Sequence, residues 1–245
     1  MEKINNINHL QRSTKVKTVV ITGANRGIGL ELTRIFLSTG KYAVIAGCRN
    51  PEAATELTKL GEEDSNLEIK ALDVTDQKSA ETFAQSLEGK PVDVLINNAG
   101  IYVDKGKGVL DADFEAWEQT YLVNVISPFR MIKVLLDNLE ASDQAKILTI
   151  SSQMGSMSLP YSASHAYCSS KAAVNKGMQG VALELKPKGI AVAVAHPGWV
   201  QTDMGGTAAD ITPAESASGL YKVVEKFSLA DTGSFYKWNG EIHPW

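Results

Sequence analysis

One pair of side chains in this sequence has a spacing that suits proton transfer. Among 7 tyrosines, Tyr167 alone is followed four residues later by a lysine, Lys171. Four residues is about one helical turn, so both side chains leave the same face of a helix. A free phenol has a pKa of about 10, and a nearby ammonium group favours its ionised form. We therefore expect Lys171 to lower the pKa of Tyr167, which then acts as a general acid or base.

A third polar side chain is expected near this pair. Ser152 follows the apolar run Ala145–Ile150, which predicts a buried strand. Open α/β sheets bind their ligands at the carboxyl ends of the strands. Ser152 is therefore expected to donate a hydrogen bond to a substrate oxygen. A serine hydrolase is set aside as an alternative, because the chain contains no G-x-S-x-G motif.

A glycine-rich turn follows the first predicted strand. From Gly23 to Gly29 the residues are Gly-Ala-Asn-Arg-Gly-Ile-Gly, and a helical pattern begins at Gly27. Glycines there allow a tight turn and let phosphate oxygens reach the N–H groups at the positive end of the helix. The turn predicts a site for a dinucleotide pyrophosphate. A Walker P-loop is excluded, because no Gly-Lys-Ser/Thr ends the motif. The alternative is an ordinary glycine-rich connection.

The residues after the second predicted strand distinguish between two dinucleotides. An NAD site has a carboxylate about 20 residues beyond the glycine turn, where it accepts from the ribose 2′-hydroxyl. Arg49 stands 20 positions after Gly29 instead, and residues 42–50 include no acid. Arg49 and Arg26 can converge on a 2′-phosphate, so we expect NADPH rather than NADH. The alternative is that both arginines are solvated loop residues.

These candidate residues are connected by elements that alternate along the chain. Short β-branched runs alternate with stretches of helical period, which is typical of βαβ units with a parallel sheet. The runs are continuously apolar, which predicts strands covered on both faces. We predict an α/β fold, a single Rossmann-like, doubly wound, parallel seven-stranded sheet with helices on both faces. The predicted strands are Lys17–Thr22, Tyr42–Gly47, Leu67–Leu72, Val92–Ile96, Ala145–Ile150, Ile190–Ala195 and Ser234–Trp238. The predicted helices are Gly27–Ser38, Pro51–Leu60, Asp76–Leu87, Asp111–Asn138, Ser164–Lys186 and Pro213–Lys226.

Residues 17–245 are expected to form one catalytic domain, because no repeat, linker or shift in composition divides the chain. Residues 1–16 are polar and rich in asparagine, which predicts a loose N-terminal tail. Asp76 is a predicted N-cap, and Gly40 and Gly189 are predicted to follow helix ends.

The composition excludes several classes of function. The chain has 245 residues, of which 44% are hydrophobic and 21% charged, as in ordinary globular proteins. Its net charge of −4 offers no excess of positive charge for nucleic acid. Cys48 and Cys168 have no C-x-x-C spacing, so no metal site is predicted and a reducing cytoplasm is favoured. The longest apolar run, Ile190–Ala195, is shorter than the roughly 18 residues that a membrane span needs, so no membrane association is expected.

Taken in order, the motifs resemble those of the short-chain dehydrogenases/reductases. The resemblance extends from about Lys17 to Gly240 and includes the glycine turn and Tyr167 with Lys171. The further matching motifs are Asp73-Val74-Thr75, Asn97-Asn98-Ala99-Gly100, Asn124, Ser152, and Pro197-Gly198 followed by Thr202.

The resemblance implies a role for each matching residue. Tyr167 would donate a proton in the reducing direction, Lys171 would bind the nicotinamide ribose, and Ser152 would orient the carbonyl. Asn124 would support a water chain leading to Lys171. The expected cofactor-binding residues are Gly23, Asn25, Arg26, Gly27, Ile28, Gly29, Arg49, Asp73, Val74, Asn97, Ala99, Gly100, Tyr167, Lys171, Pro197, Gly198, Val200 and Thr202.

The expected reaction is hydride transfer from NADPH to a ketone or aldehyde, giving an alcohol, with Tyr167 as proton donor. The loop Trp199–Pro213 is expected to cover this small carbonyl or alcohol substrate. Residues 196–206 and the end of the chain resemble the subgroup that contains C-factor signalling proteins and sniffer-type carbonyl reductases. The alternative function is therefore an NAD(P)-binding signalling or sensor protein with little turnover. The family also implies a homodimer or homotetramer.

Overall fold

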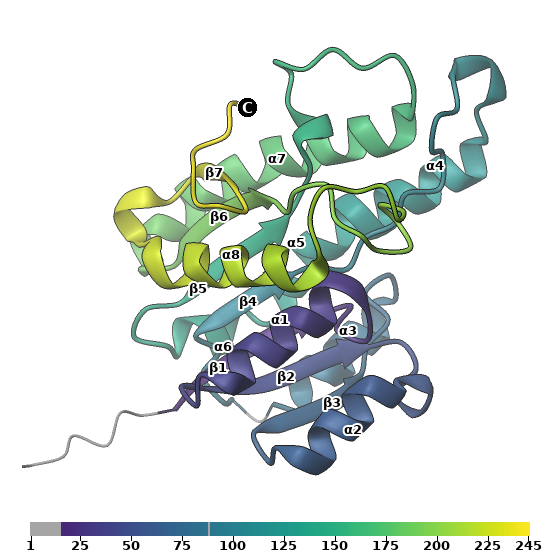
Figure 1. Ribbon diagram of the computed structural model, residues 1–245. Helices are drawn as coiled ribbons and strands as arrows, with labels where there is room; N and C mark the ends of the chain where they lie inside the picture. Colours follow the sequence, from purple (N-terminus) through teal and green to yellow (C-terminus); the bar gives the residue numbers. More distant parts are fainter. Residues whose placement is uncertain (1–15, 88) are drawn as a thin grey trace, which may run out of the picture.

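The computed structural model describes residues 16–87 and 89–245 of the chain (Figure 1). Residues 1–15 of the predicted tail lie outside the described residues. Val16, the last residue of that predicted tail, is 49% exposed and directly precedes the first strand.

Seven strands form one parallel sheet in the order β3-β2-β1-β4-β5-β6-β7. The predicted doubly wound fold is therefore confirmed. The strand order reverses between β1 and β4, and open α/β sheets bind ligands in the crevice outside the carboxyl ends at such a point. The strands are β1 (Lys17–Thr22), β2 (Tyr42–Cys48), β3 (Leu67–Ala71), β4 (Val94–Asn97), β5 (Lys146–Ile150), β6 (Ala191–His196) and β7 (Ser234–Lys237).

The strands form where the sequence is continuously apolar. All residues of β6 are buried, and in β1 all are buried except Lys17. Such strands have no face left for water, so each side of the sheet needs a covering layer. The buried apolar residues accordingly form two clusters, one of which includes Phe36 and the other Phe83.

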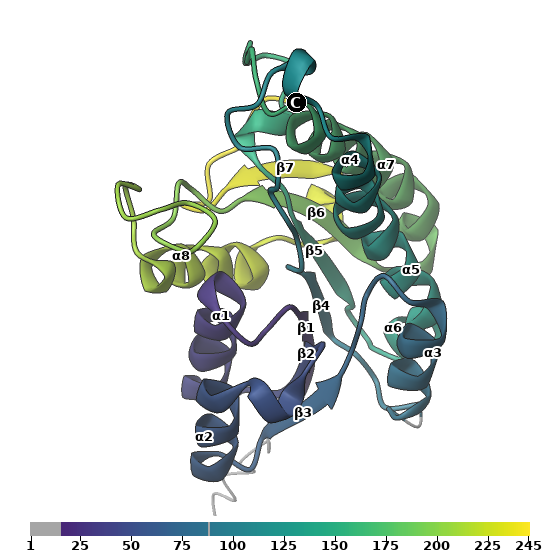
Figure 2. The same cartoon turned by 90° about the vertical axis from the view of Figure 1, so that its right-hand side faces the viewer.

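Helices supply both covering layers. Figure 2 shows α1, α2 and α8 on one face of the sheet and α3 to α7 on the other. The helices are α1 (Gly27–Ser38), α2 (Thr55–Glu63), α3 (Gln77–Gln85), α4 (Phe114–Tyr121), α5 (Ser127–Val134), α6 (Leu136–Glu140), α7 (His165–Leu185) and α8 (Pro213–Lys226).

The prediction of one continuous helix over Asp111–Asn138 is wrong. This part of the chain is divided into α4, a π-helical segment at Leu122–Ile126, α5 and α6. Pro128, in the first turn of α5, has no N–H to donate, and Ser127 Oγ donates to Leu122 O at 2.8 Å. Both features weaken regular helical hydrogen bonding at this place.

Several smaller boundaries agree with the predictions. Asp76 caps α3, and Gly40 and Gly189 follow helix ends with φ of +65° and +77°. The predicted helix Pro51–Leu60 differs, because Pro51–Ala53 form a separate 3-10 turn before α2 begins.

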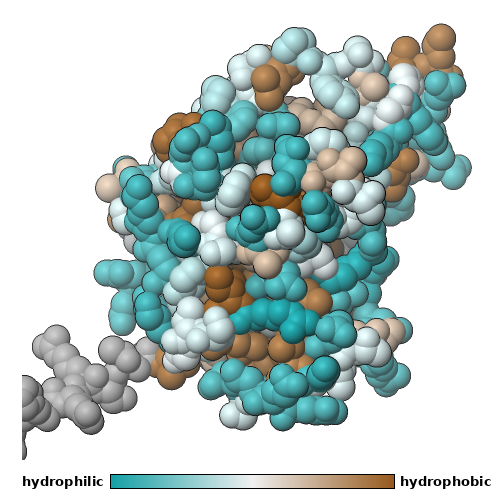
Figure 3. Space-filling view, in the orientation of Figure 1, coloured by the Kyte–Doolittle hydropathy of each residue, from teal (hydrophilic) through white to brown (hydrophobic). Residues whose placement is uncertain are grey.

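Most of the visible surface is polar (Figure 3). Apolar side chains gather at the upper right of that view, over the segment that leads into α4, where Val109, Leu110 and Phe114 are exposed. Within residues 16–87 and 89–245, no helix has the length and apolar character needed to cross a membrane.

Candidate active site

The glycine turn joins the end of β1 to the start of α1. Gly23 and Gly27 have φ of +64° and +55°, a left-handed conformation that favours glycine. Gly29 packs against the turn itself. A Cβ at Gly29 would lie 2.6 Å from Asn98 Nδ2 and would collide with Gly23 O. A side chain at this position would therefore force the turn open.

Asn98 holds the glycine turn against the end of β4. Its Nδ2 donates to Thr22 O at 3.0 Å and to Gly23 O at 3.1 Å. Thr22 Oγ1 in turn accepts from the backbone N of Asn98 and of Ala99, each at 3.1 Å. These bonds join the carboxyl ends of two adjacent strands. Asn98 is absent from the predicted cofactor-binding residues. Its position could have indicated a role, because it is a polar residue directly after a buried strand.

The start of α1 fits a phosphate group. Arg26 precedes the helix without capping it through its side chain, and the first turn contains no acidic residue. The N–H groups of the first turn and the positive end of the helix dipole are therefore available to an anion without a competing carboxylate. Asn25 is exposed beside the turn, and Ile28 is half-buried. The residues present fit the pyrophosphate of a dinucleotide.

Asp73 lies just beyond β3, close to the exposed Arg49. Its Oδ1 accepts from Thr75 N at 2.9 Å and from Thr75 Oγ1 at 2.6 Å. Burial raises the pKa of Asp73, but the bonds from Thr75 and the charges of Arg49 and Arg130 outweigh burial, so this pKa falls below its usual value. Arg130 also donates to Val74 O at 2.6 Å. Asp73 is thus an ionised acceptor beside Arg49.

The two predicted arginines differ in their partners: Arg26 forms an ion pair, whereas Arg49 acts on Asp73 through its charge. Arg26 Nη1 pairs with Asp203 Oδ2 at 2.6 Å, and both side chains are mostly exposed. Asp203 lies in the loop after β6, whereas Arg49 acts on Asp73 after β3. Arg26 thus pairs with an exposed carboxylate in this structure, and the convergence of Arg26 and Arg49 on a 2′-phosphate stays a prediction. No spacing signal points to this ion pair, because its members are 177 residues apart.

The predicted catalytic pair lies on α7 against the end of β5. Tyr167 and Lys171 leave the same face of the helix and are 7% and 5% exposed. Lys171 Nζ donates to Ile150 O at 3.0 Å, and Ser152 is close enough to the Tyr167 hydroxyl to act on its pKa. The structure therefore brings the predicted serine, tyrosine and lysine together at the carboxyl edge of the sheet.

Asn124 connects this group to the segment after β4. It lies in the π-helical segment and is almost fully buried. Its Nδ2 donates to Ile101 O at 2.9 Å and to Ser170 Oγ at 3.1 Å, and its Oδ1 accepts from Ile101 N at 2.9 Å. A Cβ at Gly100 would lie 3.4 Å from Asn124 Oδ1 and 3.6 Å from Lys171 Nζ. The amide and the ammonium thus adjoin the same backbone position, and π-helical turns are frequent at functional sites.

Burial dominates the pKa values of the catalytic pair. Burial raises the pKa of Tyr167 to about 12, although the nearby Ser152 hydroxyl opposes the rise. Burial also lowers the pKa of Lys171 to about 8. The prediction that Lys171 lowers the pKa of Tyr167 is wrong for this structure. The ammonium donates to the backbone, and Nζ lies 5.6 Å from the centroid of the phenol ring, so its charge does not offset the burial of the hydroxyl.

Asn97 keeps an acceptor without a partner. It is 4% exposed at the end of β4, and its Nδ2 donates to Thr149 Oγ1 at 3.4 Å. Its Oδ1 is buried and accepts no hydrogen bond from any described residue. Buried polar atoms without a partner are rare and costly, so this oxygen is a candidate contact for a ligand donor. The next two predicted residues, Ala99 and Gly100, are half-buried.

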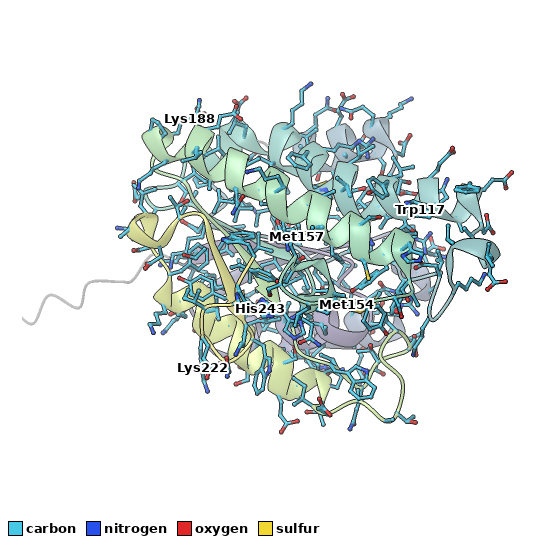
Figure 4. The ribbon with its side chains drawn as sticks, turned by 90° about the horizontal axis from the view of Figure 1, so that it is seen from above. Trp117, Met154, Met157, Lys188, Lys222 and His243 are labelled. Carbon is cyan, nitrogen blue, oxygen red and sulfur yellow. The ribbon has the colours of Figure 1, made fainter. Side chains whose placement is uncertain are left out.

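The turn after Ser152 packs directly against α7. Figure 4 shows Met154 and Met157 beside this helix. Ser152 Oγ accepts from Met154 N at 3.1 Å, and a Cβ at Gly155 would lie 2.6 Å from the backbone C of Lys171. Because Gly155 has no side chain, the backbone of this turn can pack closely against the backbone of α7 at Lys171. This close packing holds Ser152 near Lys171.

The loop after β6 lies over the glycine turn. A Cβ at Gly27 would lie 3.3 Å from Thr202 Cγ2. Trp199 Nε1 donates to Gly205 O at 2.9 Å, so the loop is held by its own hydrogen bonds, while Trp199 and Met204 expose part of their apolar surface. The role of this loop as a substrate cover stays a prediction. The other predicted residues of the segment, Pro197, Gly198 and Val200, precede Thr202 directly after β6.

Two further side chains at the site were not predicted. Tyr102 stacks on Tyr167, with ring centroids 4.1 Å apart and an interplanar angle of 21°. Asp104 accepts from the backbone N of Ala166 at 2.8 Å. The latter contact joins residues 62 apart in the chain, so no local pattern predicts it.

Comparison with known proteins identifies similar sequences and structures. A profile described as short chain dehydrogenase matches residues 17–211. The C-signal of Myxococcus xanthus is 33% identical over 164 residues, which are 66% of this chain and 98% of that protein. The NADPH-bound carbonyl reductase from chicken fatty liver is 35% identical with a TM-score of 0.89, covering 94% of this chain and 99% of that chain. The carbonyl reductase Sniffer of D. melanogaster is 27% identical, with a TM-score of 0.89 and the same coverage.

Proposed function

The chain belongs to the short-chain dehydrogenase family of oxidoreductases, and on that premise we propose that it reduces a ketone or aldehyde to an alcohol with NADPH. One observation carries the proposal. Ser152, Tyr167 and Lys171 lie together at the end of β5, and the glycine turn follows β1, two strands away in the same sheet. The residues proposed as proton donor and oxygen-binding hydroxyl therefore share one edge of the sheet with the turn proposed to bind phosphate.

The cofactor preference rests on charge at the end of β2. Arg49 stands where an NAD site has a carboxylate, and its charge is suited to a 2′-phosphate. The start of α1 would hold the pyrophosphate, and Lys171 would hold the nicotinamide ribose. The chicken carbonyl reductase with 35% identity has NADPH bound. When bound, the reduced nicotinamide supplies the hydride.

The protonation of Tyr167 suits an acid. With its pKa raised to about 12, the phenol keeps its proton at neutral pH and can donate it to the oxygen of a carbonyl that is being reduced. In this proposal Ser152 donates a second hydrogen bond to the same oxygen as negative charge develops there, and such preorganised donors typically contribute about 10²–10³ in rate. Lys171 Nζ lies 5.6 Å from the centroid of the phenol ring.

The test is NADPH oxidation, followed at 340 nm, across aldehydes, quinones, steroids and small ketones. Turnover with at least one class is the expected result. Tyr167→Phe is expected to keep NADPH affinity within about twofold and to lose at least about 10²-fold in kcat. Tyr236→Phe, which removes a hydroxyl from an equally buried tyrosine on β7, is the matched control and keeps wild-type kcat. Full activity in Tyr167→Phe would refute the proposed acid.

A second candidate is supported by one relative. The C-signal of Myxococcus xanthus, 33% identical over 66% of this chain, suggests a protein that binds the cofactor and signals with little turnover. Against it stands the presence of all four of Asn124, Ser152, Tyr167 and Lys171, which binding alone does not require. NADPH bound with no oxidation of cofactor by any substrate class would favour this alternative.

A further inference from the structure

The catalytic helix α7 is capped by a residue from another segment. At its N-terminus stands Ser164, whose own side chain makes no cap hydrogen bond. Instead, Asp104 Oδ2 accepts from Ala166 N at 2.8 Å and from Tyr167 N at 3.4 Å. A carboxylate at this end of a helix satisfies free N–H groups and complements the helix dipole. One of the two N–H groups belongs to Tyr167 itself.

Ser164 has a backbone conformation that needs support. With φ of +60° it is the single non-glycine residue of positive φ among residues 16–87 and 89–245. Residues in this region are unfavourable and tend to persist where the surroundings hold them, often at active sites. Ser164 N donates to Lys107 O at 2.8 Å, and Ser164 Oγ accepts from Gly106 N at 3.0 Å. The segment that contains Asp104 therefore also fixes the residue before α7.

The ring of Tyr102 completes the contact. It stacks on the ring of Tyr167 with centroids 4.1 Å apart, and its hydroxyl is hydrogen-bonded to Ser164 Oγ at 2.7 Å. The backbone and the side chain of Tyr167 are thus both in contact with the stretch of chain from Tyr102 to Lys107, which we name the 102–107 segment. This segment follows β4, and Ile101 just before it is hydrogen-bonded to Asn124.

We propose that Tyr102 and Asp104 are positioning residues, which set the place and orientation of the Tyr167 hydroxyl through a ring stack and a cap on its backbone. The inference rests on the proposed function, since it concerns the geometry of the same proton donor. Proton transfer needs the hydroxyl within hydrogen-bond reach of the substrate oxygen. A displacement of about 1 Å in an active site can cost about 10²-fold in rate. Loss of either contact therefore lowers turnover more than it lowers cofactor affinity.

Asp104→Ala and Asp104→Asn separate positioning from general stability. The amide of Asp104→Asn can still accept both backbone bonds. The carboxylate's other oxygen, Oδ1, is buried without a partner among the described residues, so an amide NH₂ there breaks no hydrogen bond. We expect Asp104→Ala to lower kcat by about 10- to 100-fold, with the KM and Kd for NADPH within about twofold of wild type. Asp104→Asn is expected to restore kcat to within about threefold.

The matched control is Asp113→Ala. Asp113 caps α4 from the helix's own N-cap position, accepting from Ala116 N at 3.0 Å, and no hydrogen bond is found between its side chain and Tyr167 or Ser164. It is expected to lower the thermal midpoint and to leave kcat unchanged. Equal losses of kcat in Asp113→Ala and Asp104→Ala, or no rescue by Asp104→Asn, would show that the cap is merely structural and overturn the proposal.

Tyr102→Leu and Tyr102→Phe test the stack without touching the cap. Tyr102→Phe keeps the ring, so kcat is expected to stay within about threefold of wild type, whereas Tyr102→Leu is expected to lose about 10-fold or more. Loss of the covering ring also lets water reach the Tyr167 hydroxyl, so its pKa falls in Tyr102→Leu. This fall is measured by ultraviolet difference titration of Tyr102→Leu against the double variant with Tyr167→Phe.

The titration distinguishes failure of this inference from failure of the proposed function. If the wild type turns over no carbonyl compound, the proposed function fails, yet a lowered pKa of Tyr167 in Tyr102→Leu still supports positioning by the stack. If the wild type is active and Tyr102→Leu has the wild-type kcat and titration, the inference fails and the proposed function stands. Should Asp104→Ala not fold, the two Tyr102 variants carry the test.

Discussion

Exchanging the amide of Asn98 for a carboxylate tests whether the glycine turn depends on one side chain. In the structure, Nδ2 donates to Thr22 O and Gly23 O at 3.0 and 3.1 Å. Asn98→Ala removes both bonds, each of which contributes about 0.5–1.5 kcal/mol, so the loss is about 1–3 kcal/mol in free energy of unfolding. Asn98→Asp keeps the shape but places an acceptor against two carbonyl oxygens, which adds a further loss of about 1–3 kcal/mol.

The decisive result is whether Asn98→Asp is less stable and binds NADPH more weakly than Asn98→Ala. The measurements are urea unfolding at pH 7 and the Kd for NADPH from the quenching of tryptophan fluorescence. Because about 1.4 kcal/mol corresponds to a tenfold change, a turn weakened by that amount in the binding-competent state loses about tenfold in NADPH affinity. Asn239→Asp is the control, since it makes the same chemical exchange at an exposed residue whose Oδ1 is the hydrogen-bonding atom. Equal stability and equal Kd in Asn98→Ala and Asn98→Asp would refute the reasoning.

The carboxyl group that Asn98→Asp introduces is expected to make the stability of this variant depend on pH. The two carbonyl oxygens and partial burial disfavour its charged form, so its pKa is raised above the unfolded value of about 3.9. A carboxyl whose pKa is raised in the folded state destabilises the protein when it is ionised. The extra loss in free energy of unfolding of Asn98→Asp, compared with Asn98→Ala, is therefore largest at neutral pH. The penalty shrinks as pH falls through the folded pKa. A penalty that stays constant down to pH 4 would contradict this account.

Three further changes follow from the structure. Gly155→Ala places a Cβ 2.6 Å from the backbone C of Lys171, and the overpacking is expected to cost about 1–3 kcal/mol, measured as a lowered thermal midpoint; an unchanged midpoint would show that the turn can move. Burial lowers the pKa of His196 to about 4, so the folded protein contains the neutral imidazole. The free energy of unfolding is therefore expected to fall by about 3 kcal/mol as pH falls from 6.5 towards 4, and His196→Gln is expected to flatten this dependence on pH. Asp203→Ala removes an exposed ion pair worth about 0–1 kcal/mol and releases Arg26, so NADPH is expected to bind up to about fivefold more tightly with unchanged stability; weaker binding would mean that Arg26 needs Asp203.

The parts of this protein that the sequence predicted depend on local pattern. Continuous apolar runs predict buried strands, and their alternation with helical stretches predicts a doubly wound parallel sheet. The spacing of Tyr167 and Lys171 lies within one helix, so their common face needs no knowledge of the rest of the chain. The glycine turn is likewise a single strand-to-helix connection. The helix broken at Leu122–Ile126 was missed, because the competing Ser127 hydroxyl and Pro128 act within an otherwise helical pattern.

What the sequence could not predict is the environment that sets the energies of the site. The spacing correctly placed a cation near Tyr167, but whether burial or charge decides the pKa depends on how deep the phenol lies. That depth comes from Tyr102 and the packing of α7, and the cap by Asp104 joins residues 62 apart. The ion pair of Arg26 with Asp203 spans 177 residues. Each of these contacts is made between a loop and a distant element, where no periodicity constrains the partner.

The same distinction explains why Tyr167 could be predicted as the candidate acid, whereas its pKa could not. A residue type and a spacing name the group that can carry a proton, whereas the free energy of moving that proton depends on every dipole and charge around it. Here the surroundings favour the neutral phenol, with the pKa of Tyr167 raised to about 12 and that of Lys171 lowered to about 8. Both groups are therefore less charged than in water, and a carbonyl oxygen that gains negative charge beside them meets a proton that is already in place. Such a site holds a proton on Tyr167 at neutral pH, as the proposed role of a proton donor to a carbonyl oxygen requires.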